Sequence, residues 1–231
     1  MLKDNSFKDR PIKDSLIKNG VMLGAFAIVT TALIAVTFFG TKDTIEEQKR
    51  RKLLSVLNEV VPSFLHTNPL YADCTVIDSP ALGPGNHTIY RARLNNQPAG
   101  LVVQATAPDG YSGNIDMVIG VDTQLNVLGV RVVEHKETPG LGDKVELAIS
   151  DWITTFAGKE FSSDNLAPWQ VKKDGGEFDQ FTGATITPRA VVNAVKNALI
   201  YVAENQTSLF DASNQCQTDA DINTNSQEKP S

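Results

Sequence analysis

The sequence is poor in the residues that build metal and haem sites. It has 231 residues with only three histidines and two cysteines. Cys74 and Cys216 do not form a CxxC pair, and no histidine stands at metal-motif spacing from either of them. We therefore predict no metal site. The two cysteines are compatible with one disulfide in an oxidising compartment and about equally with two free thiols.

The sequence also lacks the short motifs of common self-sufficient enzymes. It contains no GxSxG, no HExxH, no Walker loop and no GxGxxG. Three carboxylates lie close together in the chain at Asp174, Glu177 and Asp179, but an acidic loop is usually only solvated. A hydrolase with its own active site is not expected, and we predict no catalytic residue.

An excess of positive charge is missing from most of the chain. Residues 1–52 hold ten Lys and Arg against six Asp and Glu, a balance of +4. The formal net charge is −6, with 21 basic and 27 acidic residues in all, so residues 53–231 hold eleven against twenty-one, a balance of −10. Such an acidic distal part argues against nucleic acid as a partner.

One long stretch near the N-terminus has no charged residue at all. It runs from Asn19 to Thr41, and its core from Gly20 to Gly40 is almost wholly apolar. A helix of ~20 residues spans the hydrocarbon of a bilayer, whereas the apolar part of a signal peptide is usually ~7–15 residues long. We predict a retained single-pass membrane anchor, in preference to a cleaved signal peptide or a buried core helix.

The charges that flank this stretch decide little about its orientation. Five basic residues precede it and five follow it, so the positive-inside rule gives a tie. The distal basic cluster begins only at Lys49, farther from the expected membrane edge, and this favours a cytoplasmic N-terminus.

The remaining pattern predicts an α+β fold, in which an antiparallel β meander packs with helices and follows the single N-terminal transmembrane helix. We expect the meander between Thr88 and His135, because four β-branched runs alternate there with turn residues. The expected parts are an N-terminus at 1–19, the transmembrane helix at 20–40, a linker helix at 41–62, the domain at 63–207 and a polar, disordered tail at 208–231. Within the domain we expect an irregular stretch at 65–85, a helix at 142–158, a short strand at 169–173 and a last helix at 188–205.

The sequence TGATITP introduces the last expected helix. Pro188 suits the first helical position and Thr187 the N-cap, so Thr185 would lie two residues before the cap. Free backbone N–H groups at a helix start favour a phosphate, and Gly183 and Ala184 let a ligand approach the main chain. The plainer alternative is a loop with a good cap, and these residues alone do not exclude it.

A second loop, ETPGLG, precedes the helix expected at 142–158. Gly140 and Gly142 allow tight turns or close approach of a flat ligand, while Glu137 and Thr138 offer polar groups and Leu141 an apolar one. Taken alone, the loop is typical of an ordinary connection. Two glycine-containing loops before helices in one small domain make a shared phosphate-bearing ligand more credible.

These residues resemble the hallmarks of the FMN-binding domain family. TGAT at Thr182–Thr185, preceded by Asp179 and followed by Thr187, is similar to its flavinylation motif. ETPGLG at Glu137–Gly142 and GYSG at Gly110–Gly113 match further motifs. With one N-terminal anchor, the order of the motifs resembles the G subunit of the Rnf/Rsx ion-translocating electron-transport complex, which is related to the C subunit of the Na⁺-translocating NADH:quinone reductase.

The resemblance implies a covalent cofactor. A flavin transferase would join FMN from FAD through its phosphate to Thr185, by a phosphoester bond. Leu141 would pack on the flavin ring and Thr138 would offer it a polar contact, while Lys172 and Lys173 fit surface charges better than phosphate ligands. The cofactor-binding residues expected beside Thr185 are Thr182, Gly183, Ala184, Thr187, Glu137, Thr138, Gly140, Leu141 and Gly142.

The resemblance also implies an electron-carrying subunit of a redox-driven ion-translocating complex, without an independent active site. Its partners would be other integral-membrane and iron–sulfur subunits and the transferase. The protein would be a single-pass flavoprotein of the bacterial inner membrane, with an FMN-binding domain at 63–207 in the periplasm. The alternatives are a membrane-anchored binding or structural module without a redox cofactor, and a flavin reductase acting alone, for which no NADH site is evident.

Overall fold

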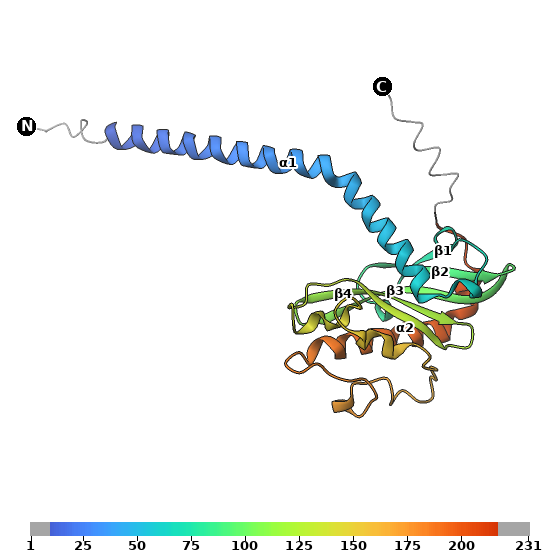
Figure 1. The fold of residues 1–231 in the computed structure, drawn as a ribbon. Coiled ribbons are helices and arrows are strands. Elements are labelled where there is room, and N and C mark those ends of the chain that lie inside the picture. The colour runs from blue at the N-terminus through green and yellow to red at the C-terminus, as the bar shows by residue number, and fades with distance from the viewer. Residues whose placement is uncertain (1–9, 217–231) are drawn as a thin grey trace, which may run out of the picture. The chain divides into compact units, whose positions relative to one another are not determined.

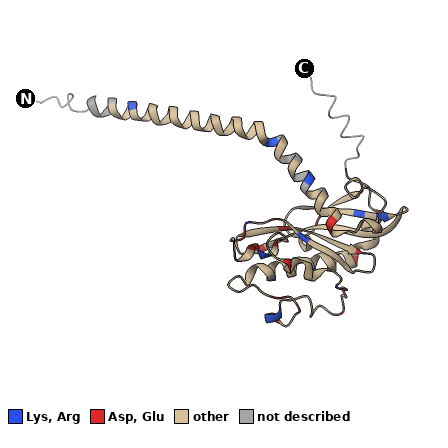
Figure 2. Ribbon diagram, in the orientation of Figure 1, with Lys and Arg blue, Asp and Glu red and all other residues tan. Residues whose placement is uncertain are grey.

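The computed structural model describes residues 10–216. The chain divides into two units, residues 1–51 and 52–231. Helix α1 (Arg10–Val60) runs through the whole of the described part of the first unit. It contains Ser15–Lys42, the one helix within the described residues that is long and apolar enough to cross a membrane. The uncharged stretch of α1 is evident in Figure 2. The apolar helix expected at 20–40 is therefore present.

The second unit is built on a five-stranded antiparallel sheet in which neighbours in sequence are neighbours in space, in the order β1-β2-β3-β4-β5 (Figure 1). The predicted α+β fold and meander are confirmed. Strand β1 lies in the region that was expected to be irregular. The strands are β1 (Cys74–Asp78), β2 (Asn86–Leu94), β3 (Gln97–Gly110), β4 (Gly113–Asp122) and β5 (Val127–Glu134).

Helices cover parts of both faces of the sheet. Helix α2 (Ile186–Asp211) lies along one face and buries a row of small and branched residues, among them Val191, Val195 and Leu199, against the strands. This is the face pattern expected of an amphipathic helix. The other face packs with the last turns of α1, which belong to the second unit and in which Leu57 and Val60 are fully buried.

Two elements expected after the meander do not form. The segment 142–158 is not one helix but two short 3₁₀ helices, η4 (Gly142–Val145) and η5 (Asp151–Phe156). The backbone of Ser150 is extended, and its hydroxyl caps η5 by accepting from the N–H of Trp152 at 3.2 Å. The strand expected at 169–173 is reduced to one bridge between Val171 and Phe178, followed by the 3₁₀ helix η6 (Lys172–Asp174).

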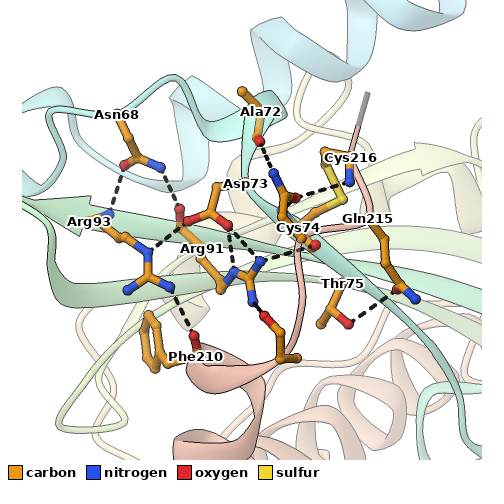
Figure 3. Close-up of polar contacts among 12 residues, drawn as sticks. Asn68, Ala72, Asp73, Cys74, Thr75, Arg91, Arg93, Phe210, Gln215 and Cys216 are labelled. Carbon is orange, nitrogen blue, oxygen red and sulfur yellow. Dashed lines mark hydrogen bonds and ion pairs between the residues drawn. A yellow bond between two sulfur atoms is a disulfide. The ribbon is translucent and has the colours of Figure 1, made fainter. Parts of the chain in front are cut away.

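The expectation of a disordered tail from residue 208 is wrong for its first nine residues. Helix α2 continues to Asp211, and Cys216 forms a disulfide with Cys74 (Figure 3). Arg91 is buried beside Cys74, and its guanidinium donates to the Cys74 carbonyl and to the carbonyls of Leu209 and Ala212 at the end of α2. Residues 217–231 of the expected tail lie outside the described residues.

We call the place where the end of α2 and residues 212–216 meet β1 and β2 the C-terminal junction. The carboxylate of Asp73 holds it together. Asp73 accepts from the Nε atoms of Arg91 and Arg93, each at 2.7 Å, and Arg93 also donates to the carbonyl of Phe210 at 2.9 Å. A buried guanidinium is costly unless it is paired and hydrogen-bonded, and both conditions are met here. The end of α2 is thereby fixed to β1 and β2.

Candidate cofactor site

The TGAT sequence forms a tight turn at the start of α2. The N–H of Ala184 donates to the carbonyl of Phe181 at 3.1 Å, which closes the turn. Gly183 occupies it with φ +82°, a conformation that a residue with a side chain rarely adopts. Thr182 and Thr185 are both exposed. The turn therefore presents two hydroxyls to solvent, one on each side of a Gly-Ala step.

The start of α2 differs from the expectation by two residues. The helix begins at Ile186, so Thr185 itself is the N-cap residue, whereas Thr187, expected as the cap, lies inside the first turn and is fully buried. The hydroxyl of Thr185 makes no capping hydrogen bond. A negatively charged group on this side chain would meet the free N–H groups and the positive dipole end of α2.

A cleft of about 340 Å³ opens beside Thr185. Its walls come from three connections that are far apart in sequence: the tip of the β3–β4 hairpin, the ETPGLG loop after β5 and the TGAT turn before α2. Its lining residues are Tyr111, Glu137, Thr138, Leu141, Gly142, Gly183, Ala184, Thr185, Ile186 and Thr187. The fold thus brings both glycine-containing loops to one place, as expected from the sequence.

Leu141 and the neighbouring glycines shape the apolar wall of the cleft. Leu141 is 41% exposed, and its Cδ2 lies 3.4 Å from where a Cβ on Gly183 would be. Gly142 is buried, and a Cβ there would lie 2.6 Å from Glu137 Oε2 and 2.8 Å from Thr187 Oγ1. Any larger residue at position 142 would therefore push these two groups apart.

Glu137 is buried, with an exposed fraction of 5%, and holds the three connections together. Its Oε1 accepts from the N–H of Ser112 in the hairpin tip at 2.9 Å, and its Oε2 accepts from the hydroxyl of Thr187 in α2. Its own N–H donates to Nδ1 of His135 at 3.1 Å. The sequence suggested Glu137 as a polar group for a ligand, but both of its oxygens are engaged by the protein.

The charged residues near the TGAT motif pair with each other at the surface. Lys172 Nζ lies 2.6 Å from Asp179 Oδ1, and both side chains are more than half exposed. Arg189, one turn into α2, pairs with Asp174, and this contact lowers the pKa of the Asp174 carboxyl. Such exposed pairs contribute little to stability. The backbone of Asp179 is held more firmly, since the indole N–H of Trp152 donates to its carbonyl at 2.9 Å.

Two lining residues were not predicted from the sequence. Tyr111 at the hairpin tip is 70% exposed and Ile186 is 44% exposed, so both offer large apolar surfaces at the rim of the cleft. Tyr111 belongs to the GYSG motif, which could have served as a signal for it. Ile186 was not expected to line a site because the helix was expected to begin only at Pro188.

These features fit a flavin mononucleotide. The cleft offers apolar side chains at Leu141, Ile186 and Tyr111 for a flat aromatic ring, and a helix N-terminus for a phosphate. Gly183 leaves the space above Leu141 free of a side chain. Within the described residues, no group of three or more His, Cys, Asp or Glu could hold a metal ion.

Comparison with known families defines the class of protein. Residues 110–200 match the FMN-binding domain, a range that contains all the lining residues of the cleft. Residues 5–60 match the RnfG N-terminal region, a range that contains the whole of α1. The class is therefore an FMN-binding domain that follows a long, apolar N-terminal helix.

Curated relatives identify the family. The chain is 50% identical over 209 residues to the G subunit of the ion-translocating oxidoreductase complex of Pseudoalteromonas atlantica, covering 90% of this chain and 97% of the relative. Proteins of the same name from Salmonella typhimurium and Vibrio atlanticus are 52% and 49% identical, over 80% and 85% of this chain and 89% and 95% of theirs. The chain belongs to the G-subunit family of the ion-translocating oxidoreductase complex. This confirms the family expected from the motifs, and with it a subunit of an ion-translocating oxidoreductase complex.

Proposed function

We propose that this protein carries electrons within a membrane-bound ion-translocating complex, through an FMN attached by a phosphoester bond to Thr185. The observation that carries the proposal is the exposed Thr185 hydroxyl at the N-cap of α2, at the rim of a partly apolar cleft. When bound, FMN supplies the redox chemistry, and the protein orients the ring and tunes its potential.

The attachment requires a hydroxyl that an incoming diphosphate can reach. With FAD as donor, the Thr185 oxygen attacks the phosphorus of the FMN half. The P–O bond to the AMP half breaks, AMP leaves, and the hydroxyl proton is lost. No electrons are transferred in this step. Gly183 and Ala184 keep the approach open, while the N–H groups of the first turn of α2 stabilise the negative phosphodiester.

We further propose that the domain lies on the periplasmic side of the bacterial inner membrane and is modified there by a flavin transferase. The disulfide between Cys74 and Cys216 supports this side, because such bonds persist in oxidising compartments. Ser15–Lys42 in α1 provides a segment long enough for a single crossing. The other integral-membrane and iron–sulfur subunits would exchange electrons with the flavin.

The covalent linkage is tested by a matched pair of threonine variants in the same turn. The full-length protein is expressed with a flavin transferase, purified in detergent and measured by intact mass and in-gel flavin fluorescence. We expect wild type and Thr182→Val to gain the mass of FMN minus water, and Thr185→Val to lose it. Both threonines are exposed, so neither change should prevent folding.

Three outcomes would contradict the proposal in different ways. Equal labelling of Thr185→Val and wild type would move the linkage to another residue. Tightly held FMN without a mass gain would overturn the covalent bond but keep the cofactor. A colourless wild-type protein under these conditions would favour the alternative of an anchored binding module without a redox cofactor.

A further inference from the structure

One of the residues that line the cofactor cleft is a buried carboxylate, Glu137. Glu137 is 5% exposed and Thr187 is fully buried. The two side chains are 50 residues apart in the sequence and meet through one hydrogen bond, from the threonine hydroxyl to Oε2. A hydrogen bond to an ionised acceptor is roughly twice as strong as one between neutral groups.

The carboxylate joins all three walls of the cleft at one point. Its first oxygen holds the hairpin tip through the N–H of Ser112, beside Tyr111. Its second oxygen holds the first turn of α2 through Thr187, two residues from Thr185. Its backbone belongs to the ETPGLG loop, whose Leu141 lies beside Gly183. Among the described lining residues, Glu137 alone has hydrogen bonds that reach from its own loop to both other walls.

The neighbouring groups pack closely on this contact. Gly142 is packed so closely on the pair that a single added methyl group would lie 2.6 Å from the carboxylate. The Glu137 N–H is fixed by Nδ1 of His135, whose Nε2 lies 3.4 Å from a carboxylate oxygen of Glu146. Loss of either the Glu137 carboxylate or the Thr187 hydroxyl would leave the other group buried and unsatisfied. This costs more than the hydrogen bond between them contributes.

We propose that Glu137 is a positioning residue for flavin attachment: through Ser112 and Thr187 its carboxylate holds the hairpin tip, the ETPGLG loop and α2 in the arrangement that presents Thr185 to the transferase and encloses the ring. This inference rests on the proposed covalent FMN at Thr185. The role assigned to Glu137 is indirect: its two carboxylate oxygens accept from Ser112 and Thr187, and it acts on Thr185 through these contacts.

The test uses substitutions that remove one hydrogen bond with little change of shape. Thr187→Val removes the hydroxyl, and Thr187→Ser retains it. Glu137→Gln keeps one acceptor for Ser112 but places an NH₂ group opposite Thr187. Glu177→Gln is the control, because Glu177 is an exposed carboxylate in the same domain that pairs with Lys159. All variants are made in the full-length protein in detergent.

Two readouts separate positioning from general stability. The first is the initial rate of FMN attachment by a purified transferase with FAD, followed by intact mass far below the unfolding temperature of each variant. The second is quenching of the attached flavin's fluorescence by iodide, measured after prolonged labelling has made every variant fully flavinylated. Thermal unfolding of each unlabelled variant identifies those that have simply lost their fold.

We expect Glu137→Gln and Thr187→Val each to slow attachment by about tenfold or more, since small misplacements of a reacting group have effects of this order. The double variant should be no slower than the worse single variant, because the two residues act as one unit. Thr187→Ser should label faster than Thr187→Val, because it retains the hydroxyl that donates to Glu137, and Glu177→Gln should label at the wild-type rate. Iodide should quench the flavin of the two slow variants more strongly, toward the value for free FMN.

The inference and the proposed function fail in different ways. If wild type acquires no FMN, the proposed function falls first. If wild type is labelled and the folded Glu137→Gln and Thr187→Val variants match it in both rate and quenching, only the role of Glu137 is overturned. Additive rate losses in the double variant would likewise show that the two side chains do not act through their mutual contact.

Discussion

At the scale of single residues, the environments of two threonines in one short stretch are opposite. Thr185 is exposed and its hydroxyl is not used in capping, whereas Thr187 is fully buried and donates to Glu137. From the sequence, both were expected among the cofactor-binding residues, and Thr187 was expected as the N-cap. The structure instead gives the first a position open to a reagent and the second a role in holding the walls of the cleft.

The TGAT and ETPGLG motifs predicted where glycines take up special conformations or close contacts. They did not predict which groups the polar side chains contact. Gly140 and Gly183 have positive φ angles, and Gly142 is in a close contact, as expected of glycines in special loops. The partner of Glu137 could not be found, because a hydrogen bond across 50 residues leaves no local pattern. The shifted helix start has a similar origin, since Pro188 is compatible with several positions in the first turn.

His87 gives a prediction about pH. It is buried on β2, its Nε2 lies 3.2 Å from Thr106 Oγ1, and that hydroxyl donates to Asp116 at 2.6 Å. Burial lowers the pKa of His87 below its ordinary value of 6.5, although the carbonyl of Gly85 and the carboxylates of Asp116 and Asp78 act in the opposite direction. The native state therefore binds this proton less readily than the unfolded state.

It follows that the contribution of neutral His87 is fully present above pH 6.5 and is lost as the pH falls toward the native pKa. We expect His87→Gln, which cannot be protonated, to lose less stability than wild type between about pH 7 and about pH 5. Urea unfolding of the full-length protein at both pH values measures this. Equal losses in the two proteins would show that His87 does not titrate differently on folding.

At the scale of elements, the strands of the meander were predictable because alternation and turn residues are local signals. The helix expected at 142–158 does not form, although Val145, Trp152 and Phe156 are all buried, as the pattern required. Ile149, in the same pattern, is 54% exposed. The serine cap at Ser150 starts a new short helix, and such side-chain bonds compete with a continuous one. Strand β1 was missed because it has only five residues, Cys74–Asp78, and lies in a stretch with many turn residues.

The end of α1 depends on a glycine in the sheet. A Cβ on Gly120 in β4 would lie 2.3 Å from the carbonyl oxygen of Val60, whereas one on Gly129 in β5 would approach the same residue only to 3.3 Å. We expect Gly120→Ala to displace the last turn of α1 and to destabilise the domain by about 1–3 kcal/mol, as overpacking does elsewhere.

Gly129→Ala serves as the control and should have a smaller effect. Thermal unfolding gives the stability, and hydrogen exchange of the amides at 56–61 reports the local contact. If both variants unfold at the same temperature and their amides at 56–61 exchange at the same rate, the close approach to β4 is not what fixes the end of α1.

At the scale of the whole molecule, one covalent bond closes most of the domain into a loop. Cys74 and Cys216 are 142 residues apart. We expect the Cys74→Ser, Cys216→Ser double variant to be about 2–5 kcal/mol less stable than wild type, because an unfolded chain without this link has more freedom. Thermal unfolding with and without a reductant measures the effect.

The reductant supplies the internal control for this prediction. It should lower the unfolding temperature of wild type and leave that of the double variant unchanged. If reduction changes neither protein, the network of Arg91, Asp73 and Arg93 is sufficient to hold the C-terminal junction without the disulfide.

The path of the chain after α2 has a consequence for self-association. Residues 214–216 run beside β1: Gln215 donates its N–H to the Cys74 carbonyl, and its side chain accepts from the N–H of Val76. On the opposite border, Val127 in β5 exchanges backbone hydrogen bonds with the segment 158–159. An exposed edge strand is a template for strand addition from another molecule, and natural proteins cover such edges. Here both outer strands are at least partly occupied by the protein's own chain, so recruitment of a second sheet into a fibril-like stack is hindered at either side.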